Sequence, residues 1–178
     1  VPKSRVKREP YFKQGDVLSV EFGGEYGLLF VSKIDQTPRK IEYHLACTRL
    51  LQKDKPSMDD FLNSEIACSH LSKNVGVNLD DNFSLDDIFD IKISHNSDGK
   101  EFAVDTDCWF NHKDLGQLID RFEKIGRVEL EDYVLGTLSP ASTLDDIYNQ
   151  ITLNKKTWNL KFKDTRELIK AFETDERT

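Results

Sequence analysis

The sequence has few cysteines, no long apolar stretch and no recognisable membrane-targeting pattern. No apolar run among its 178 residues approaches the roughly 18 residues of a helical membrane span. The basic start is followed by no apolar region of the kind found in secretory signals. We therefore expect no membrane partner.

The three cysteines, Cys47, Cys68 and Cys108, are widely spaced, odd in number and without a C-x-x-C pair. This spacing indicates neither a zinc site nor a disulfide framework. A reducing, cytoplasmic setting fits best.

Motifs for metals and phosphates are also missing. The four histidines form no H-x-H, H-x-x-x-H or H-E-x-x-H pattern, which argues against a metal site. The glycines of the first thirty residues form neither G-x-G-x-x-G nor a phosphate-binding loop, and they flank expected strands. We predict no metal and no cofactor. The histidines are His44, His70, His95 and His112.

Charge is plentiful, and its sign is informative. The chain is 32% charged and 38% hydrophobic, with a net charge of −7 and a pI near 5.1. An acidic surface disfavours direct binding to nucleic-acid phosphates. Residues 54–107 hold thirteen Asp and Glu against four Lys, whereas residues 1–13 are mainly basic.

The pattern of residues from Tyr11 to Ile34 predicts the first two strands of the fold. Apolar and polar residues alternate from Val17 to Phe22, as in a half-buried strand. The pair Gly23-Gly24 then breaks the pattern, and a second apolar run follows, which favours a β-hairpin. The residues Lys13-Gln14-Gly15-Asp16 predict a turn before the first strand.

The later segments predict more strands and about three helices. Strands are expected over 41–51, 65–73, 91–95, 101–110, 128–138 and 158–162, with helices over 112–126, 143–152 and 164–173. The predicted fold is α+β: a strongly bent antiparallel sheet, contributed mainly by residues 11–110 with an SH3-like opening, on which the helices pack. We expect a flexible basic arm over 1–10 and one domain over 11–178, with a possible subdomain edge near 52–57.

An apolar-Asp-Asp-apolar pattern follows a Ser or Thr at three places, Met58–Phe61, Leu85–Ile88 and Leu144–Ile147. Carboxylates in a first helical turn are stabilised by the free amides there, by about 0.3–1 kcal/mol each. We interpret the three places as helix starts, and a ligand-binding repeat is the alternative.

The densest carboxylate group is the candidate site. Such a group can bind Ca²⁺ or Mg²⁺ or act as an acid–base pair, but its spacing fails the EF-hand template. Helix caps on a solvated acidic surface account for this group without any site. The functional alternative, on which our prediction of function depends, is a specific acidic face that attracts and binds a basic partner. The predicted partner-binding residues are Asp80, Asp81, Asp86, Asp87, Asp90, Asp105 and Asp107.

A nucleophilic site would have to combine Cys108 with His112 and Asp105. Cys108 lies in an apolar strand pattern, where buried and inert thiols are common. We interpret Trp109 and Trp158 as core residues rather than as surfaces on which a ligand stacks. The sequence thus predicts no catalytic residues.

The opening PYFKQGDVLSVEF, followed by EYGLLFVSKI, resembles the immunity protein 26 family of bacterial polymorphic toxin systems. The matching residues are Lys13, Gly15, Asp16, Val17, Tyr26 and Gly27, and the helix start at Met58–Leu62 is also similar. The resemblance covers about 65 of the 178 residues. It implies a cytoplasmic, non-enzymatic protein that binds and neutralises a cognate toxin, such as a basic nuclease.

Two alternatives remain open from the residues. One is a small hydrolase whose Asp and His residues are brought together by folding. The other is an SH3-like adaptor that binds a peptide with aromatic residues of the opening hairpin.

Overall fold

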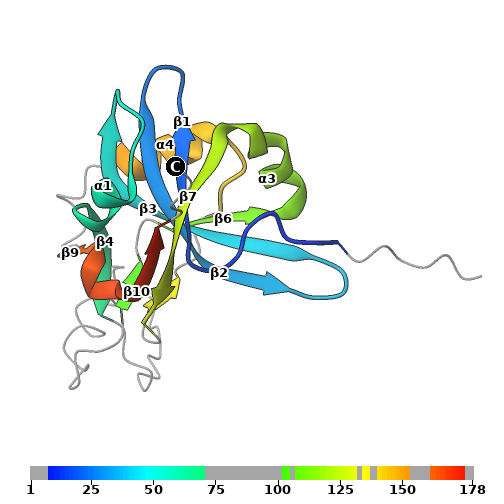
Figure 1. Ribbon diagram of the computed structural model, residues 1–178. Helices are drawn as coiled ribbons and strands as arrows, with labels where there is room; N and C mark the ends of the chain where they lie inside the picture. Colours follow the sequence, from blue (N-terminus) through cyan, green and yellow to red (C-terminus); the bar gives the residue numbers. More distant parts are fainter. Residues whose placement is uncertain are drawn as a thin grey trace, which may run out of the picture.

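A curled antiparallel sheet forms the framework of the protein in the computed structural model (Figure 1). The structure describes residues 8–70, 102–104, 107–131, 134–136, 140–152 and 161–174. Ten strands are joined in the order β10-β7-β1-β2-β3-β4-β5-β8, with β6 paired to β3 and β9 paired to β4. The sheet bends into a half-barrel, and β5 and β8 are paired in parallel. An α+β fold with a strongly bent, mainly antiparallel sheet is thus confirmed.

The strands and helices alternate unevenly along the chain. The strands are β1 (Asp16–Glu21), β2 (Tyr26–Gln36), β3 (Ile41–Gln52), β4 (Glu65–His70), β5 (Phe102–Val104), β6 (Asp107–Asn111), β7 (Phe122–Leu130), β8 (Val134–Gly136), β9 (Lys161–Asp164) and β10 (Ile169–Thr174). The helices are α1 (Met58–Leu62), α3 (His112–Leu118) and α4 (Leu144–Thr152), with 3-10 turns η1 (Ile119–Arg121) and η3 (Thr165–Leu168).

The opening hairpin forms as its sequence predicts. Val17 in β1 is paired with Phe30 in β2, and the register continues to Glu21 and Tyr26. Gly23 and Gly24 have φ angles of 80° and 119°, a region that residues with a side chain rarely adopt.

The turn before β1 is built around Gly15, which has a φ of 87°. Its amide donates to the carbonyl of Val31 (2.8 Å) and its carbonyl accepts from the amide of Val128 (2.8 Å). The carboxylate of Asp16 accepts from the amide of Lys13 (2.8 Å). The predicted turn therefore exists, and it also connects β2 to β7.

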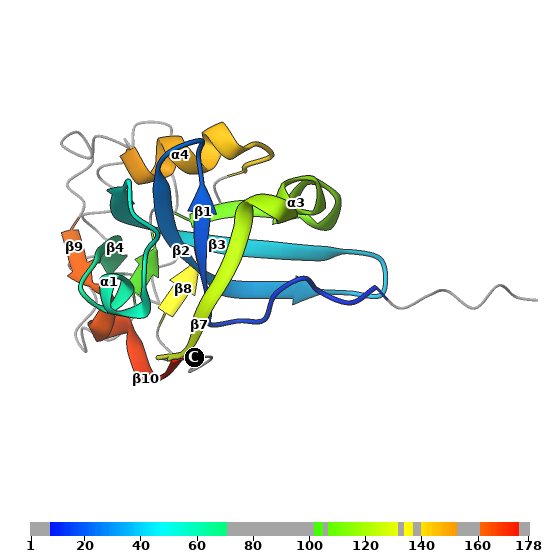
Figure 2. The same cartoon turned by 45° about the horizontal axis from the view of Figure 1, so that its top comes forward.

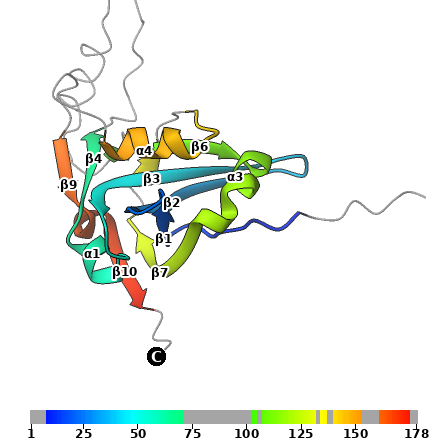
Figure 3. The same ribbon diagram turned by 90° about the horizontal axis from the view of Figure 1, so that it is seen from above.

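The sheet buries both of its faces near β1, β2 and β3. On one face, α1 and η3 supply Met58, Phe61 and Leu168 to an apolar cluster around Phe30, which we call the α1-side cluster. On the other face, Leu115 of α3 and two isoleucines of α4 join a cluster around Tyr43 and Leu45, which we call the α4-side cluster. Figure 3 shows β3 between α4 and α1. The two isoleucines are Ile147 and Ile151.

Two of the predicted helix starts are confirmed by their caps. The Ser57 hydroxyl accepts from the Asp60 amide (3.3 Å), and the Asp60 carboxylate accepts from the Ser57 amide (2.8 Å). Asp146 accepts from the amides of Ser142 (2.8 Å) and Thr143 (3.0 Å) ahead of α4. These bonds satisfy amides that a helix start leaves free. The third predicted start, Leu85–Ile88, lies outside the described residues.

The helix predicted over 112–126 is too long. It ends at Leu118, and Phe122 begins β7, which pairs with β1 at Val20 and with β10 further along. The apolar spacing of Phe122 and Ile125 fits a helix locally, but these two residues lie in a strand held by two neighbours. Long-range pairing here overrides local propensity.

The closing helix predicted over 164–173 is wrong. Thr165–Leu168 form a 3-10 turn, and Ile169–Thr174 form β10 beside β7. The sheet therefore extends well beyond residues 11–110, and the described part of the C-terminal region has two α-helices, α3 and α4. The predicted strand over 91–95 lies outside the described ranges.

Candidate functional site

The β2–β3 hairpin projects past α3 at one end of the molecule (Figure 2). A β-bulge at Ser32 divides it, because Val31 pairs with Leu45 whereas Lys33 pairs with His44. The Ser32 hydroxyl donates to the His44 carbonyl (3.2 Å), and the Gln14 side chain donates to the Ser32 carbonyl (3.1 Å). Such a bulge changes which side chains face each side of the strand.

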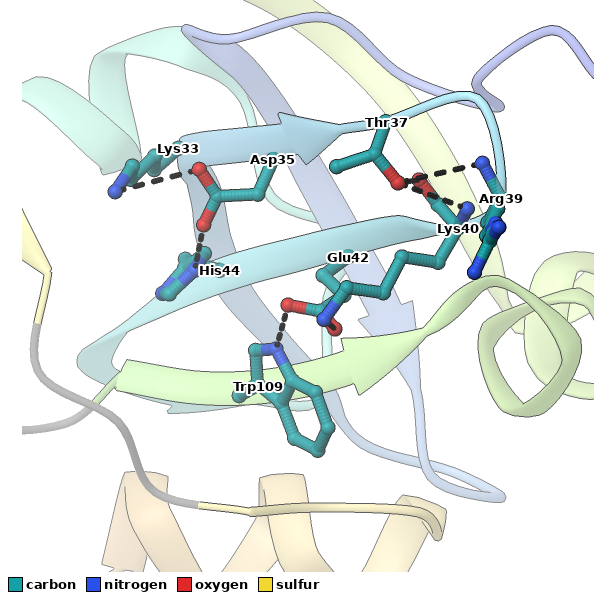
Figure 4. Close-up of polar contacts among 8 residues, drawn as sticks. All are labelled: Lys33, Asp35, Thr37, Arg39, Lys40, Glu42, His44 and Trp109. Atoms are coloured by element: carbon teal, nitrogen blue, oxygen red, sulfur yellow. Dashed lines mark hydrogen bonds and ion pairs between the residues drawn. The ribbon is translucent and has the colours of Figure 1, made fainter.

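Beyond the bulge, one side of the sheet is polar. Cross-strand partners share a face, so the pairs Lys33–His44 and Asp35–Glu42 lie side by side, and Trp109 of β6 follows opposite His44. We call this the outer polar face, defined by Lys33, Asp35, Glu42, His44 and Trp109 (Figure 4). Its reverse side belongs to the α4-side cluster through Ile41 and Tyr43.

Each carboxylate of the outer polar face lies between a lysine and a ring N–H. Asp35 contacts Lys33 Nζ at 3.3 Å and His44 Nε2 at 3.1 Å. Glu42 contacts Lys40 Nζ at 2.6 Å and accepts from Trp109 Nε1 at 3.2 Å. The lysine side chains are 56% and 63% exposed, whereas the His44 side chain is 4% exposed. The rings therefore hold the carboxylates from the buried side, and the lysines pair with them on the exposed side.

These contacts keep both carboxylates ionised. Burial alone would raise the pKa of Asp35, but hydrogen bonds from His44 and Lys33 and their charges more than offset it, so the pKa is lowered. The hydrogen bond from Lys40 is the largest cause of the lowered pKa of Glu42; burial opposes it, and Trp109 adds to it. Two negative charges thus face each other across β2 and β3.

The Asp35–His44 pair has the geometry of an acid–base pair. The imidazole is buried, and the carboxylate side chain is 42% exposed. The Ser32 hydroxyl on the same hairpin donates to the His44 backbone, so its proton is not directed at the ring. The arrangement holds a carboxylate in place and does not form a Ser-His-Asp nucleophile.

A second group, the Tyr11 cluster, consists of Tyr11, Tyr43 and His112. The rings of Tyr11 and His112 stack with centroids 4.3 Å apart and an interplanar angle of 2°. Tyr43 Oη lies 2.7 Å from His112 Nδ1 and accepts from the Tyr11 amide at 3.1 Å. A Cβ atom at Gly116 would lie 2.5 Å from Tyr11 Oη. The lack of a side chain at Gly116 therefore leaves room for the Tyr11 ring against α3.

The Tyr11 cluster connects the chain before β1 to α3 and the sheet. Burial raises the pKa of Tyr43 and lowers the pKa of His112, and the Arg8 charge lowers the latter further. His112 is therefore neutral near pH 7, which lets Nδ1 accept a hydrogen bond from the Tyr43 hydroxyl.

An open groove lies where β7 and β10 meet. It is lined by polar and apolar groups, and Phe172 is 53% exposed beside it. No buried ionisable pair is among its lining residues, which are Gln14, Arg127, Val128, Glu129, Leu130, Ala171 and Phe172.

Most of the predicted acidic site cannot be placed. Asp80, Asp81, Asp86, Asp87, Asp90 and Asp105 lie outside the described residues. The backbone of Asp107 is in β6 opposite Ala46. The structure therefore neither brings these residues together nor separates them.

In the nucleophilic alternative, Asp105 lies outside the described residues, and the other two members contact other groups. Cys108 is fully buried with its Sγ 3.9 Å from Cys47 Sγ, and His112 is bonded to Tyr43 instead. Within the described ranges, no three His, Cys, Asp or Glu side chains lie close enough together to hold a metal ion.

The outer polar face was not predicted from the sequence, although its signal is present. Glu42 and His44 alternate with apolar residues in β3, which marks them as one side of a strand. The partners Asp35 and Trp109 come from other strands, so periodicity along one segment does not reveal them. Trp109 is half-buried, and Phe110 beside it is in the core.

Comparisons with known proteins give no match: no family model, curated protein or solved structure is similar to this chain. Among the helices in the described part, none is long and apolar enough to cross a membrane.

Proposed function

We propose that this chain is a non-enzymatic immunity protein that binds and neutralises a cognate bacterial toxin domain. The observation that carries the proposal is the projecting hairpin with its outer polar face. Asp35 and Glu42 are held there by the rings of His44 and Trp109 before any partner arrives. Side chains fixed in advance lose less conformational entropy on binding, which favours recognition of a protein surface.

The charge of the chain supports a basic partner. The net charge is −7, and the acidic residues concentrate in 54–107. An acidic protein associates faster with a basic one, and the same charges reject acidic competitors. A nuclease, whose cleft accepts phosphates, is a partner of this kind. We propose that the contact surface combines the outer polar face with the predicted acidic residues Asp80, Asp81, Asp86, Asp87, Asp90, Asp105 and Asp107. We further propose that the protein acts in the cytoplasm. The proposal includes an SH3-like arrangement of the first strands. It also draws on the resemblance of the opening sequence to the immunity protein 26 family.

Affinity capture followed by a growth assay tests the function. The tagged chain should retain a basic toxin domain from a lysate of its native cells, and that domain, expressed alone, should arrest growth. Co-expression of the chain should restore growth. A captured protein whose toxicity is unaffected by the chain would contradict neutralisation.

A matched pair of charge variants tests the surface. Changing Asp80, Asp81, Asp86, Asp87 and Asp90 to Asn should weaken toxin binding and reduce its salt dependence. The control changes five exposed carboxylates elsewhere to amides, at Asp54, Asp120, Glu123, Glu129 and Asp145. Both variants alter net charge equally, so an equal loss of affinity would show that the named surface has no special role.

The Asp35–His44 pair favours a second candidate, a small hydrolase. In that case Asp35→Asn would abolish turnover of a small substrate while the chain stays folded. Turnover that is unchanged in this variant would exclude the pair as its site.

A further inference from the structure

Two buried thiols meet where β3 and β6 pair. Cys47 and Cys108 are each 0% exposed and are not joined in a disulfide, and their Sγ atoms are 3.9 Å apart. The proposed toxin binding uses neither sulfur, so the pair is a separate feature of the molecule.

The register allows the two sulfurs to approach. Cys108 is opposite Leu45, and Cys47 lies two residues further along β3, so the cysteines are diagonal neighbours on one face. Diagonal residues have Cα atoms roughly 7–8 Å apart, and a disulfide needs about 4.4–6.8 Å. The β3–β6 pairing ends at Ala46 and Asp107, beside Cys47. A disulfide between these cysteines therefore requires an inward shift of the strands at this end of the pairing.

The surroundings control access to the thiols. Both cysteines belong to the α4-side cluster with Tyr43, Leu45 and Phe110. Buried thiols react slowly while the fold is closed, so an oxidant reaches them when β6 opens locally.

We propose that Cys47 and Cys108 form a reversible disulfide when the protein meets a peroxide. The first thiolate to be exposed attacks the peroxide O–O bond, which yields a sulfenic acid and, from hydrogen peroxide, one water. The second thiol attacks the sulfenic sulfur, forms the S–S bond and expels a second water. The two thiols together lose two electrons and two protons, and hydrogen peroxide is reduced to two waters.

The bond would join the hairpin strand β3 to β6, which continues directly into α3. Since His112 of α3 holds the Tyr11 cluster, the disulfide would also fix the segment before β1. Oxidation is thereby a way of tightening one end of the fold, and thiol reductants reverse it.

Peptide mapping of the full-length protein tests the proposal. The protein is treated with hydrogen peroxide, free thiols are alkylated, and the digest is examined by mass spectrometry. We expect a linked peptide pair containing Cys47 and Cys108, lighter by two hydrogen atoms than the separate peptides, that disappears after dithiothreitol. Alkylation of both cysteines after treatment, or a link that includes Cys68, would overturn the proposal.

Two variants sharpen this experiment. Cys68→Ala should form the same link at the same rate, because the proposed bond joins only Cys47 and Cys108. Cys108→Ala should lose the link, and if this variant does not fold, the wild type and Cys68→Ala alone decide the outcome. Amide hydrogen exchange in β6 should slow in the oxidised protein, and unchanged exchange would contradict the inferred tightening.

Discussion

The two halves of the β2–β3 hairpin differ in how many of their faces are buried. The inner half, Leu28–Val31 with Leu45–Thr48, is at most 1% exposed at every residue, because apolar clusters cover both faces. The outer half, Lys33–Gln36 with Ile41–His44, is covered by apolar residues on one face and bears charged residues on the other. The Ser32 bulge marks the boundary. One pair of strands thus provides stability at one end and a polar surface at the other.

The largest loss of stability should come from a substitution in the inner half of the hairpin. Phe30→Ala removes a ring that contacts Phe61 with centroids 5.8 Å apart in the α1-side cluster. We expect a loss of about 3–5 kcal/mol in the free energy of unfolding, measured by urea denaturation. Ile34→Ala, in the outer half, is the matched control and should lose less. Equal losses would remove the distinction between the halves.

A smaller loss of stability is expected at the Gly15 turn, which is hydrogen-bonded to β2 beside the Ser32 bulge and to β7. Gly15→Ala places a Cβ atom against the Val128 carbonyl at a φ of +87°, so we expect a loss of about 1–3 kcal/mol. Gly23→Ala shares the positive φ of +80° but has no atom within 4 Å of the added Cβ. The difference between the two variants, by thermal or urea unfolding, measures the contact with β7. If Gly23→Ala loses more stability than Gly15→Ala, the contact of the Gly15 turn with β7 does not stabilise the fold.

The Tyr11 cluster should make stability depend on pH. The pKa of His112 is lowered in the folded protein, mainly by burial, and is about 6.5 in the unfolded chain. The unfolded state therefore binds more protons between these two pKa values, and the stabilising contribution is complete above about pH 6.5. It is lost as the pH falls through the folded-state pKa.

His112→Phe keeps a ring against Tyr11 and removes the titrating group. The variant should be less stable at pH 8 by about 1 kcal/mol, because the Tyr43 hydroxyl loses its acceptor, and its stability should vary less between pH 5 and 7. Urea denaturation across this range is the measurement. An unchanged pH slope would show that His112 does not control it.

The smallest effect is expected on the outer polar face. Asp35 is 42% exposed, so Asp35→Asn should reduce stability by no more than about 1 kcal/mol at neutral pH. The folded-state pKa of Asp35 is lowered, so its contribution is present above the unfolded carboxyl pKa and is lost as the pH falls through the folded value. High salt should also diminish the difference from the wild type. A larger loss that persists in acid would mean that Asp35 belongs to the core.

The sequence predicted the segments that are organised by neighbours close along the chain. The alternation from Val17 to Phe22, the Gly23-Gly24 turn and the caps at Ser57 and Asp146 all depend on residues a few positions apart. Each of these features can therefore be predicted from the local sequence.

Segments organised by distant neighbours were not predictable in the same way. Phe122 and Ile125 have helical spacing, yet they lie in a strand between β1 and β10. The bulge at Ser32 leaves no mark in composition, and Asp35 meets His44 because of the register that this bulge creates. The outer polar face depends on three strands at once, so a reading of each strand separately does not find it.

The turn from Thr37 to Lys40 is the exposed end of the projecting hairpin, with the Thr37 hydroxyl accepting from the amides of Arg39 and Lys40. Lengthening a surface loop adds little closure entropy. A fluorophore or a short epitope inserted there would report on encounters with other molecules without disturbing the packed interior, which makes this tip the natural attachment point for sensors.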